Sequence, residues 1–165
     1  MASPELRDLA ERLQGICLGR GLTVVVAESC TGGLVAATLT DVPGSSGYFV
    51  AGVVSYADAA KTALLGVHES SLAAHGAVSA QVALAMATGA RERLGASLSG
   101  SVTGVAGPDG GSDEKPVGLT YVGVADALGS DVRRFVWTGD RLSNREESAR
   151  AVLELLIERA EAAGE

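Results

Sequence analysis

The order of strand-like and helix-like segments constrains the fold of this chain more than any other feature of its sequence. Short runs rich in β-branched and apolar residues are expected as strands at residues 22–27, 48–56, 98–105, 119–125 and 132–138. The first three alternate with helical patterns, which is typical of a parallel sheet, and the last two follow each other and are expected to pair as a hairpin. The sequence therefore predicts an α/β fold: a three-layer α/β/α sandwich on a mixed sheet of about five strands.

Helical patterns connect and flank these strands. Helices are expected at residues 4–18, 31–40, 59–65, 70–75, 79–94 and 143–162. Ser79 precedes the most regular of them in a position that favours an N-cap, and Gly95 follows it in a position that favours a stop. No repeat or linker interrupts the pattern, so residues 1–165 are expected to form a single domain.

Charge and composition argue against several classes of partner and cofactor. The net charge of −7 disfavours nucleic acid or an anionic membrane as a partner, and no apolar stretch resembles a membrane span or a signal peptide. Cys17 and Cys30 form neither a disulfide framework nor a metal motif, and His68 and His75 are too few for a histidine-rich zinc site. We therefore expect a cytoplasmic protein with no metal and no cofactor.

The stretch AESCTGG, residues 27–33, follows a predicted strand and opens a predicted helix. Ser29 is thus expected at the carboxyl edge of the sheet, where open α/β folds bind ligands. The backbone amides of residues 31–33 would lie at a helix N-terminus, where they attract a phosphate or an oxyanion. Two interpretations stay open: a nucleophile presented beside anion-binding amides, or hydroxyl side chains that merely cap the helix. Cys30 is likewise either a thiolate of lowered pKa or a residue of the core.

A serine without a histidine partner needs another base, and a lysine follows the next predicted strand. Tyr56 ends that strand, Lys61 lies on the first turns of a short helix, and only two of the 13 basic residues are lysines. Burial or positive neighbours lower the pKa of a lysine, so that its neutral amine can accept a proton, and a tyrosine hydroxyl can orient that proton. The alternative is a solvated Lys61 beside a core tyrosine.

A long loop rich in glycine and proline follows the third predicted strand, at residues 106–116. Together with Thr103 and Gly104 before it, its main chain forms a candidate wall for a sugar, phosphate or amide, and Lys115 is a candidate phosphate ligand. Loops of this length without structure of their own are often functional, although a plain surface loop is the simpler alternative. The segment matches neither a P-loop nor a dinucleotide fingerprint.

Two arginines stand where the last helix begins. Arg141 and Arg145 have the side chain best suited to bidentate phosphate binding. They are equally compatible with surface arginines at a helix start marked by Asp140. Both interpretations stay open.

Taken together, these stretches resemble the CinA C-terminal domain family and, within it, the stand-alone PncC-type nicotinamide-nucleotide amidohydrolases. The resemblance covers about residues 5–160 in family order. It is carried by the segments AESCTGG, DVPGSSGYFVAGVVSYADAAK, LLGV, HGAVSAQVALAMA, VTGVAGPDGGSDEKPVG and TGDR. It implies a mixed five-stranded α/β/α fold and hydrolysis of nicotinamide mononucleotide to nicotinate mononucleotide and ammonia, without a metal or redox cofactor. The family's larger proteins fuse this domain to an N-terminal molybdopterin-binding-like domain, whose chemistry is not expected here.

The resemblance also implies roles for individual residues. Ser29 stands where the family has its nucleophile, and Tyr56 and Lys61 match the tyrosine and lysine beside it. Lys61 would take the proton of Ser29 with help from Tyr56, and amides of residues 31–33 or of the glycine-rich loop would hold the oxyanion. The implied substrate-binding residues are Thr31, Gly32, Gly33, Thr103, Gly104, Gly107, Gly110, Gly111, Lys115, Arg141 and Arg145. The expected partner is this small nucleotide, bound to a homodimer or larger homo-oligomer.

One departure from the family pattern bears on activity. Family members often have Ser-Tyr-Ser-Asn-Glu-Ala-Lys where this chain has Ser55-Tyr-Ala-Asp-Ala-Ala-Lys61. A negative Asp58 close to Lys61 would stabilise the protonated amine and oppose general-base action. Two alternatives therefore stand beside the amidase: a catalytically inactive nucleotide-binding regulatory module, and an amidase for a different nucleotide or amide.

Overall fold

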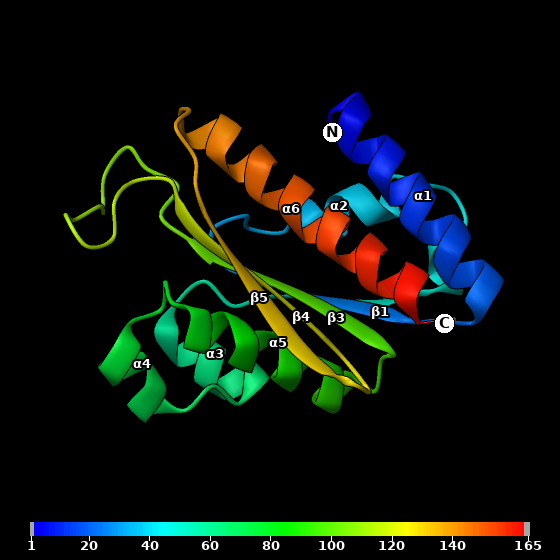
Figure 1. Cartoon of the computed structure of the whole chain (residues 1–165), viewed down its shortest axis with the longest axis horizontal. Helices are drawn as coiled ribbons and strands as arrows, with labels where there is room; N and C mark the ends of the chain where they lie inside the picture. Colours follow the sequence, from blue (N-terminus) through cyan, green and yellow to red (C-terminus); the bar gives the residue numbers. More distant parts are fainter. Residues whose placement is uncertain (1, 164–165) are drawn as a thin grey trace.

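The computed structural model describes residues 2–163 as one sheet between two layers of helices (Figure 1). Its elements are α1 (Pro4–Arg20), β1 (Val24–Glu28), α2 (Leu34–Thr40), the 3-10 turn η1 (Ser45–Gly47), β2 (Phe49–Val54), α3 (Asp58–Leu65), α4 (Glu69–His75), α5 (Ala80–Leu94), β3 (Leu98–Gly104), β4 (Leu119–Asp126), β5 (Gly129–Val136) and α6 (Arg141–Ala162). None of these helices is long and apolar enough to cross a membrane.

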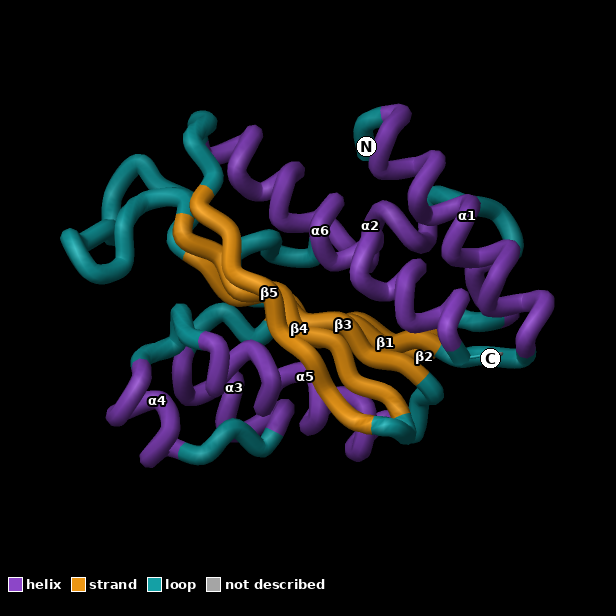
Figure 2. The backbone as a smooth tube through the Cα atoms, in the orientation of Figure 1, coloured by secondary structure: helices purple, strands orange, loops and turns teal. Residues whose placement is uncertain are grey.

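The sheet has five strands in the order β2-β1-β3-β4-β5. β1 pairs in parallel with both β2 and β3, whereas β3–β4 and β4–β5 are antiparallel. Helices α1, α2 and α6 cover one face, and α3, α4 and α5 cover the other (Figures 1 and 2). The predicted three-layer α/β/α sandwich on a mixed sheet is confirmed, because the parallel strands are joined by helical crossovers and the last two by a tight turn.

The central strand β1 is buried along its whole length and contributes to a separate core on each face. Val24 and Val26 belong to the larger core, which α1, α2 and α6 close, and Val25 and Ala27 belong to the smaller core against α5. Side chains alternate between the faces of a strand. The contacts described below follow this alternation, since the next residue, Glu28, reaches α2 and Ser29 reaches α3.

The helix predicted from residue 31 begins three residues later, at Leu34. The backbone first makes a turn in which Gly32 and Gly33 adopt positive φ of 59° and 103°, a region that non-glycine residues avoid. Thr31 does not cap this helix: its hydroxyl donates to the carboxylate of Glu28. Residues 31–33 are therefore a turn between strand and helix rather than a first helical turn.

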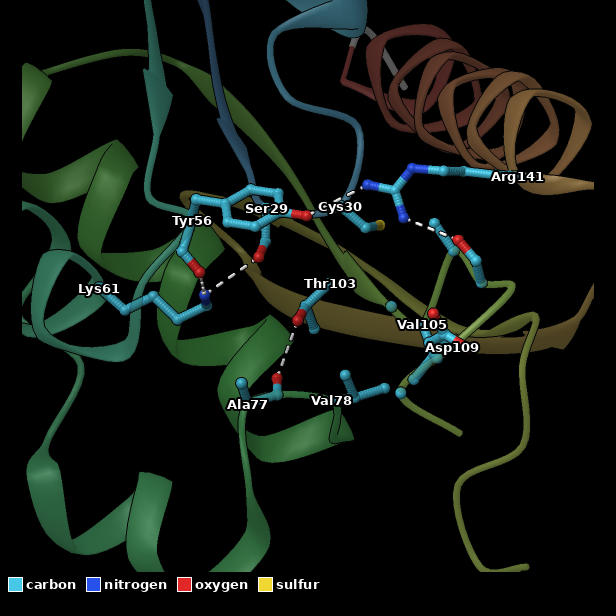
Figure 3. Close-up of a pocket in the computed structure, with 14 residues that line it drawn as sticks. Ser29, Cys30, Tyr56, Lys61, Ala77, Val78, Thr103, Val105, Asp109 and Arg141 are labelled. Carbon is cyan, nitrogen blue, oxygen red and sulfur yellow. Dashed lines mark hydrogen bonds between the residues drawn. The ribbon is translucent and has the colours of Figure 1, made fainter. Parts of the chain in front are cut away.

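The last helix starts earlier than its hydrophobic pattern indicates. It begins at Arg141 rather than 143, because the Asp140 side chain accepts a hydrogen bond from the Ser143 amide and so acts as the N-cap. This places Arg141 in the first turn of α6, at the same end of the sheet as Ser29 (Figure 3).

Helices α3 and α5 approach each other closely at Gly89, which yields a test of the packing. A β-carbon at residue 89 would lie 1.9 Å from the backbone oxygen of Leu65. We expect Gly89→Ala to lower the free energy of unfolding by roughly 1–3 kcal/mol, because backbone has to move to relieve the overlap. Gly15→Ala is the matched control: residue 15 is an exposed position of α1 where an added β-carbon would have no atom within 4 Å, so this variant should gain roughly 0.5–1 kcal/mol. Equilibrium urea denaturation measures both, and equal stability of the two variants would contradict the packing described.

Candidate functional site

The carboxyl ends of the three parallel strands meet beside a cavity of about 280 Å³. This is the edge of an open α/β sheet at which ligands are expected. Nine of the residues singled out in the sequence line the cavity: Ser29, Cys30, Tyr56, Lys61, Thr103, Gly104, Gly107, Gly110 and Arg141. The others are Ala77, Val78, Val105, Ala106 and Asp109. Figure 3 shows Lys61 and Ser29 pointing toward one another, with Arg141 approaching from α6.

One hydrogen bond across the site joins two side chains that are 32 residues apart. Lys61 Nζ lies 3.0 Å from Ser29 Oγ. Lys61 is 0% exposed and Ser29 is 8% exposed, so bulk water does not separate them. Ser29 follows β1 directly, and its amide donates to Val102 O of β3 at 3.0 Å, which holds the residue at the sheet edge. The geometry suits transfer of a proton between hydroxyl and amine.

The remaining partners of Lys61 are main-chain carbonyls. Its Nζ donates to Ser55 O at 2.8 Å and to Tyr56 O at 3.0 Å, both just beyond the end of β2. A neutral amine has two N–H groups and one lone pair. When the two N–H groups bond to the two carbonyls, the lone pair faces Ser29 Oγ. In its neutral form the amine is therefore oriented to accept a hydrogen bond from the Ser29 hydroxyl.

Burial lowers the pKa of Lys61 from its ordinary value of 10.5. Asp58 raises the pKa by its negative charge, as the sequence led us to expect. The effect of burial is the larger one, so the net direction is downward. Asp58 thus opposes, without cancelling, the release of the proton from Lys61.

Tyr56 enters the site through two different groups. Its backbone oxygen accepts from Lys61, while its phenol oxygen accepts from Arg141 Nη2 at 3.3 Å. The side chain is 60% exposed. Arg141 also donates through Nη1 to Gly107 O at 2.8 Å, so its guanidinium spans the space between Tyr56 and the glycine-rich loop. The structure thus connects the phenol to Arg141 and the backbone carbonyl to the amine; assistance by the phenol in catalysis stays a prediction.

Six of the predicted substrate-binding residues lie outside the lining of the cavity: Thr31, Gly32, Gly33, Gly111, Lys115 and Arg145. The charged members of this set bond to main-chain oxygens. Lys115 Nζ donates to His75 O at the end of α4. Arg145 donates to Cys30 O at 3.2 Å and to Thr31 O at 2.8 Å. A role of these six residues in binding substrate stays a prediction. In this structure the side chains of Lys115 and Arg145 donate hydrogen bonds to backbone carbonyls.

The amides of the first turn of α2 are bonded within the protein. The Val35 and Ala36 amides donate to the Glu28 carboxylate, each at 3.0 Å. The Gly32 amide donates to Ser29 O, and the Leu34 amide to Thr31 O. The sequence suggested an anion site at this helix N-terminus. The Val35 and Ala36 donors are occupied by a carboxylate of the chain itself, and the anion site predicted at the amides of residues 31–33 stays a prediction.

Cys30 is a residue of the core and not a thiolate. It is 7% exposed and belongs to the larger hydrophobic cluster. Burial raises the pKa of its thiol to about 12. The lowered pKa considered for a cysteine at a helix start is therefore wrong here, because the helix begins four residues later and desolvation dominates.

Three features of the site were missed in the sequence. Glu28 is fully buried beneath the turn, and a charged residue at the end of an otherwise apolar strand was the available signal. Asn144, 2% exposed, donates through Nδ2 to Ala106 O at 3.0 Å and accepts from the Gly139 amide at 3.0 Å, which ties the glycine-rich loop to α6. Ala77 and Val78 give the cavity an apolar wall from the segment before α5. The side chain of Thr103 holds that segment by donating to Ala77 O at 2.9 Å.

Between residues 2 and 163, no three His, Cys, Asp or Glu side chains are grouped so that they could hold a metal ion.

Comparisons of the sequence identify a group of similar proteins. The family model described as the CinA C-terminal domain matches residues 6–160. A CinA-like protein of Geobacter sulfurreducens is 53% identical over 140 residues, which make up 85% of this chain and 34% of that protein. A CinA-like protein of Chlorobaculum tepidum is 51% identical over 156 residues, 92% of this chain and 37% of that protein. The chain spans about a third of the length of these curated relatives.

Two solved structures have a similar fold, and the similarity covers almost the whole length of this chain and of theirs. The competence/damage inducible protein CihA of Agrobacterium tumefaciens has a TM-score of 0.90 and 41% identity, covering 95% of this chain and 96% of that one. A CinA superfamily protein of Klebsiella pneumoniae has a TM-score of 0.91 and 31% identity, covering 95% of this chain and 98% of that one.

The lowered pKa of Lys61 can be observed directly. In protein labelled with ¹³C at the lysine ε-carbon, two resonances are expected, from Lys61 and Lys115, and Lys115→Arg assigns them. We expect the Lys61 resonance to titrate below 10.5 in the folded protein and to return to that value in urea, because unfolding restores its hydration. A folded-state pKa at or above 10.5 would show that the amine is not held in the environment described.

Proposed function

The chain belongs to the CinA C-terminal domain family, and from this premise we propose that it is a serine amidohydrolase that converts nicotinamide mononucleotide to nicotinate mononucleotide and ammonia. One observation carries the proposal: a buried lysine amine lies 3.0 Å from the hydroxyl of a buried serine at the ligand-binding edge of the sheet. The partner in this proposal is a small nucleotide and not nucleic acid, which the net charge of −7 disfavours, and the protein acts in the cytoplasm as a homo-oligomer.

The first step is acylation of Ser29. Neutral Lys61 takes the hydroxyl proton while Oγ attacks the carboxamide carbon, so that a carbon–oxygen bond forms and the carbonyl oxygen becomes an oxyanion. The C–N bond then breaks, and the Lys61 ammonium returns the proton to the departing nitrogen, which leaves as ammonia. An ester of Ser29 with the nicotinate carbonyl remains.

The second step is hydrolysis of that ester. Water attacks the same carbon, Lys61 accepts a proton from the water, and the proton returns to Ser29 Oγ as the ester bond breaks. The two carbonyls of Ser55 and Tyr56 bond to Lys61 Nζ throughout, which keeps the amine aligned on Ser29 in both steps. Main-chain amides of the glycine-rich loop, whose residues Ala106 and Gly107 line the cavity, are the candidates for stabilising the oxyanion.

Arg141 is the guanidinium group of the cavity and is our candidate for the phosphate of the substrate. It now bonds to Gly107 O and the phenol of Tyr56. A bidentate phosphate contact would replace the bond to Tyr56, the longer of the two. The apolar wall of Ala77 and Val78 offers a surface for the nicotinamide ring.

Asp58 favours a second candidate, an inactive nucleotide-binding regulatory module. It raises the pKa of Lys61 and therefore increases the fraction of ammonium at neutral pH. A hydrolase acting on another nucleotide or amide shares the same chemistry, and a panel of amide substrates distinguishes it from the first proposal.

Ammonia release from nicotinamide mononucleotide tests the proposal. We expect Ser29→Ala to abolish measurable turnover and Lys61→Ala to reduce kcat by roughly 10²–10⁴-fold, because these changes remove the nucleophile and its base. Ser46→Ala, an exposed serine of η1, is the control and should retain full activity. The assay is run with a chelator present, and chromatography identifies nicotinate mononucleotide. Nucleotide binding by the parent without ammonia release would favour the regulatory module, and full activity of Ser29→Ala would exclude the mechanism.

The charge of Asp58 leads to a prediction about pH dependence. The reactive form of Lys61 is neutral, so kcat/KM rises with pH as the amine loses its proton. Asp58→Asn removes a charge that raises the pKa of Lys61, and the acidic limb should therefore move to lower pH. Glu69→Gln, an exposed carboxylate of α4, should leave the limb in place. A limb that moves to higher pH in Asp58→Asn would contradict the role of Lys61 as base.

A further inference from the structure

We infer that Glu28 is a positioning residue for the nucleophile: its buried carboxylate fixes the turn of residues 29–33, and with it the direction of Ser29 Oγ toward Lys61 Nζ. This inference rests on the proposed function, since it concerns the same serine. It adds a residue that touches neither the cavity nor the reacting atoms.

The carboxylate of Glu28 is completely enclosed and bonded at both oxygens. Glu28 is 0% exposed and is the one acidic residue among the buried side chains of residues 2–163. Its Oε1 accepts from Thr31 Oγ1 at 2.6 Å and from the Val35 amide at 3.0 Å. Its Oε2 accepts from the Ala36 amide at 3.0 Å. Such charge-assisted bonds are about twice as strong as neutral ones and form at the positive end of a helix dipole.

These bonds join the residue before Ser29 to residues that follow it in the chain. One residue, Glu28, lies before the turn; Thr31 is inside it, and Val35 and Ala36 lie after it. Helix α2 begins with Gly33 at its N-cap, which has no side chain to cap it, so the carboxylate from the preceding strand takes that place. The path of the chain through Ser29 is therefore set by a side chain anchored on both sides of it.

The backbone of the same residue reaches the other half of the site. Glu28 O accepts from the Ser55 amide at 2.8 Å, and Ser55 O in turn accepts from Lys61 Nζ at 2.8 Å. Residue 28 is thus bonded to the serine turn through its side chain and to the acceptor of the lysine through its main chain. A shift at this residue changes the separation of Ser29 and Lys61 directly.

A second side chain holds the turn from helix α6. Arg145 donates to Cys30 O and Thr31 O, the two carbonyls that follow the nucleophile. The turn is consequently fixed at its carbonyls by Arg145 and at the next amides by Glu28. Ser29 Oγ, on the other face of the sheet, is left to bond with Lys61.

The variant Glu28→Gln tests whether the hydrogen bonds of the carboxylate, rather than the volume of the side chain, position Ser29. The amide has nearly the same shape, but only one of its two terminal atoms accepts hydrogen bonds. If that oxygen keeps Thr31 and Val35, the NH₂ group opposes the N–H of Ala36, and the start of α2 has to move. A displacement of about 1 Å near a nucleophile can cost on the order of 10²-fold in rate.

The experiment compares Glu28→Gln and Thr31→Val with Thr38→Val. Thr38 is the matched control because it is also 0% exposed on α2 and donates its hydroxyl to Leu34 O at 2.7 Å, a bond within the helix that does not involve Glu28. Two rates are measured: ammonia release from nicotinamide mononucleotide, as kcat and KM, and phosphonylation of Ser29 by a fluorophosphonate above the Ser29→Ala background. In that reaction the Oγ–P bond forms, the P–F bond breaks, fluoride leaves, and Lys61 takes the proton.

We expect Glu28→Gln to lower both kcat and the phosphonylation rate by about tenfold or more with KM changed by less than about twofold, and Thr31→Val to lower them less. Thr38→Val should lower the denaturation midpoint without lowering either rate. Equal rates in Thr31→Val and Thr38→Val, or in a folded Glu28→Gln and the parent, would overturn the inference, as would a parent whose Ser29 is not phosphonylated. If Glu28→Gln does not fold, Thr31→Val decides. Failure of the proposed function appears differently: no ammonia is released, while phosphonylation still depends on Glu28.

Discussion

The burial of one amine, Lys61, is the constraint around which this end of the protein is organised. An ammonium group without a counterion is costly in a protein interior, and the cost falls when the group becomes neutral. The fold supplies two carbonyl acceptors and one hydroxyl, and no carboxylate of residues 2–163 bonds directly to the nitrogen. The parallel strands β1 and β2, the turn after β1 and helix α3 all have to take their observed positions for these partners to meet.

Much of the architecture could be predicted from local patterns. Strand and helix periodicities depend on which face of each segment is apolar, and that information is present in each segment by itself. The start of α2 could not be obtained in this way. The helix is capped by Glu28, a carboxylate from the preceding strand, so its first residue depends on a contact that crosses the turn. The earlier start of α6, by contrast, followed from Asp140, whose capping position is visible in the sequence.

The positions of some site residues could likewise be predicted from the sequence, and those of others could not. Ser29 and Lys61 follow neighbouring strands, and strand order brings the carboxyl ends of such strands to one edge. Arg145 and Lys115 were predicted as phosphate ligands because arginine and lysine suit that role, and that role stays a prediction. The oxygens to which they donate in the structure are backbone carbonyls of distant segments. Which carbonyls face a cation is a property of the assembled tertiary structure. The composition of the chain and the spacing of its residues do not indicate which carbonyls these are.

The glycine-rich loop is anchored near both of its ends. Arg141 and Asn144 of α6 bond to its first carbonyls, and Lys115, at its far end, bonds to the end of α4. The loop is thereby joined to both helical layers. The exposed residues 108–114, which lie between these attachment points, carry no such attachment to either layer. In the proposed function, differences in the size of the substrate would therefore be accommodated by residues 108–114, while residues 106 and 107 next to the serine stay fixed to α6.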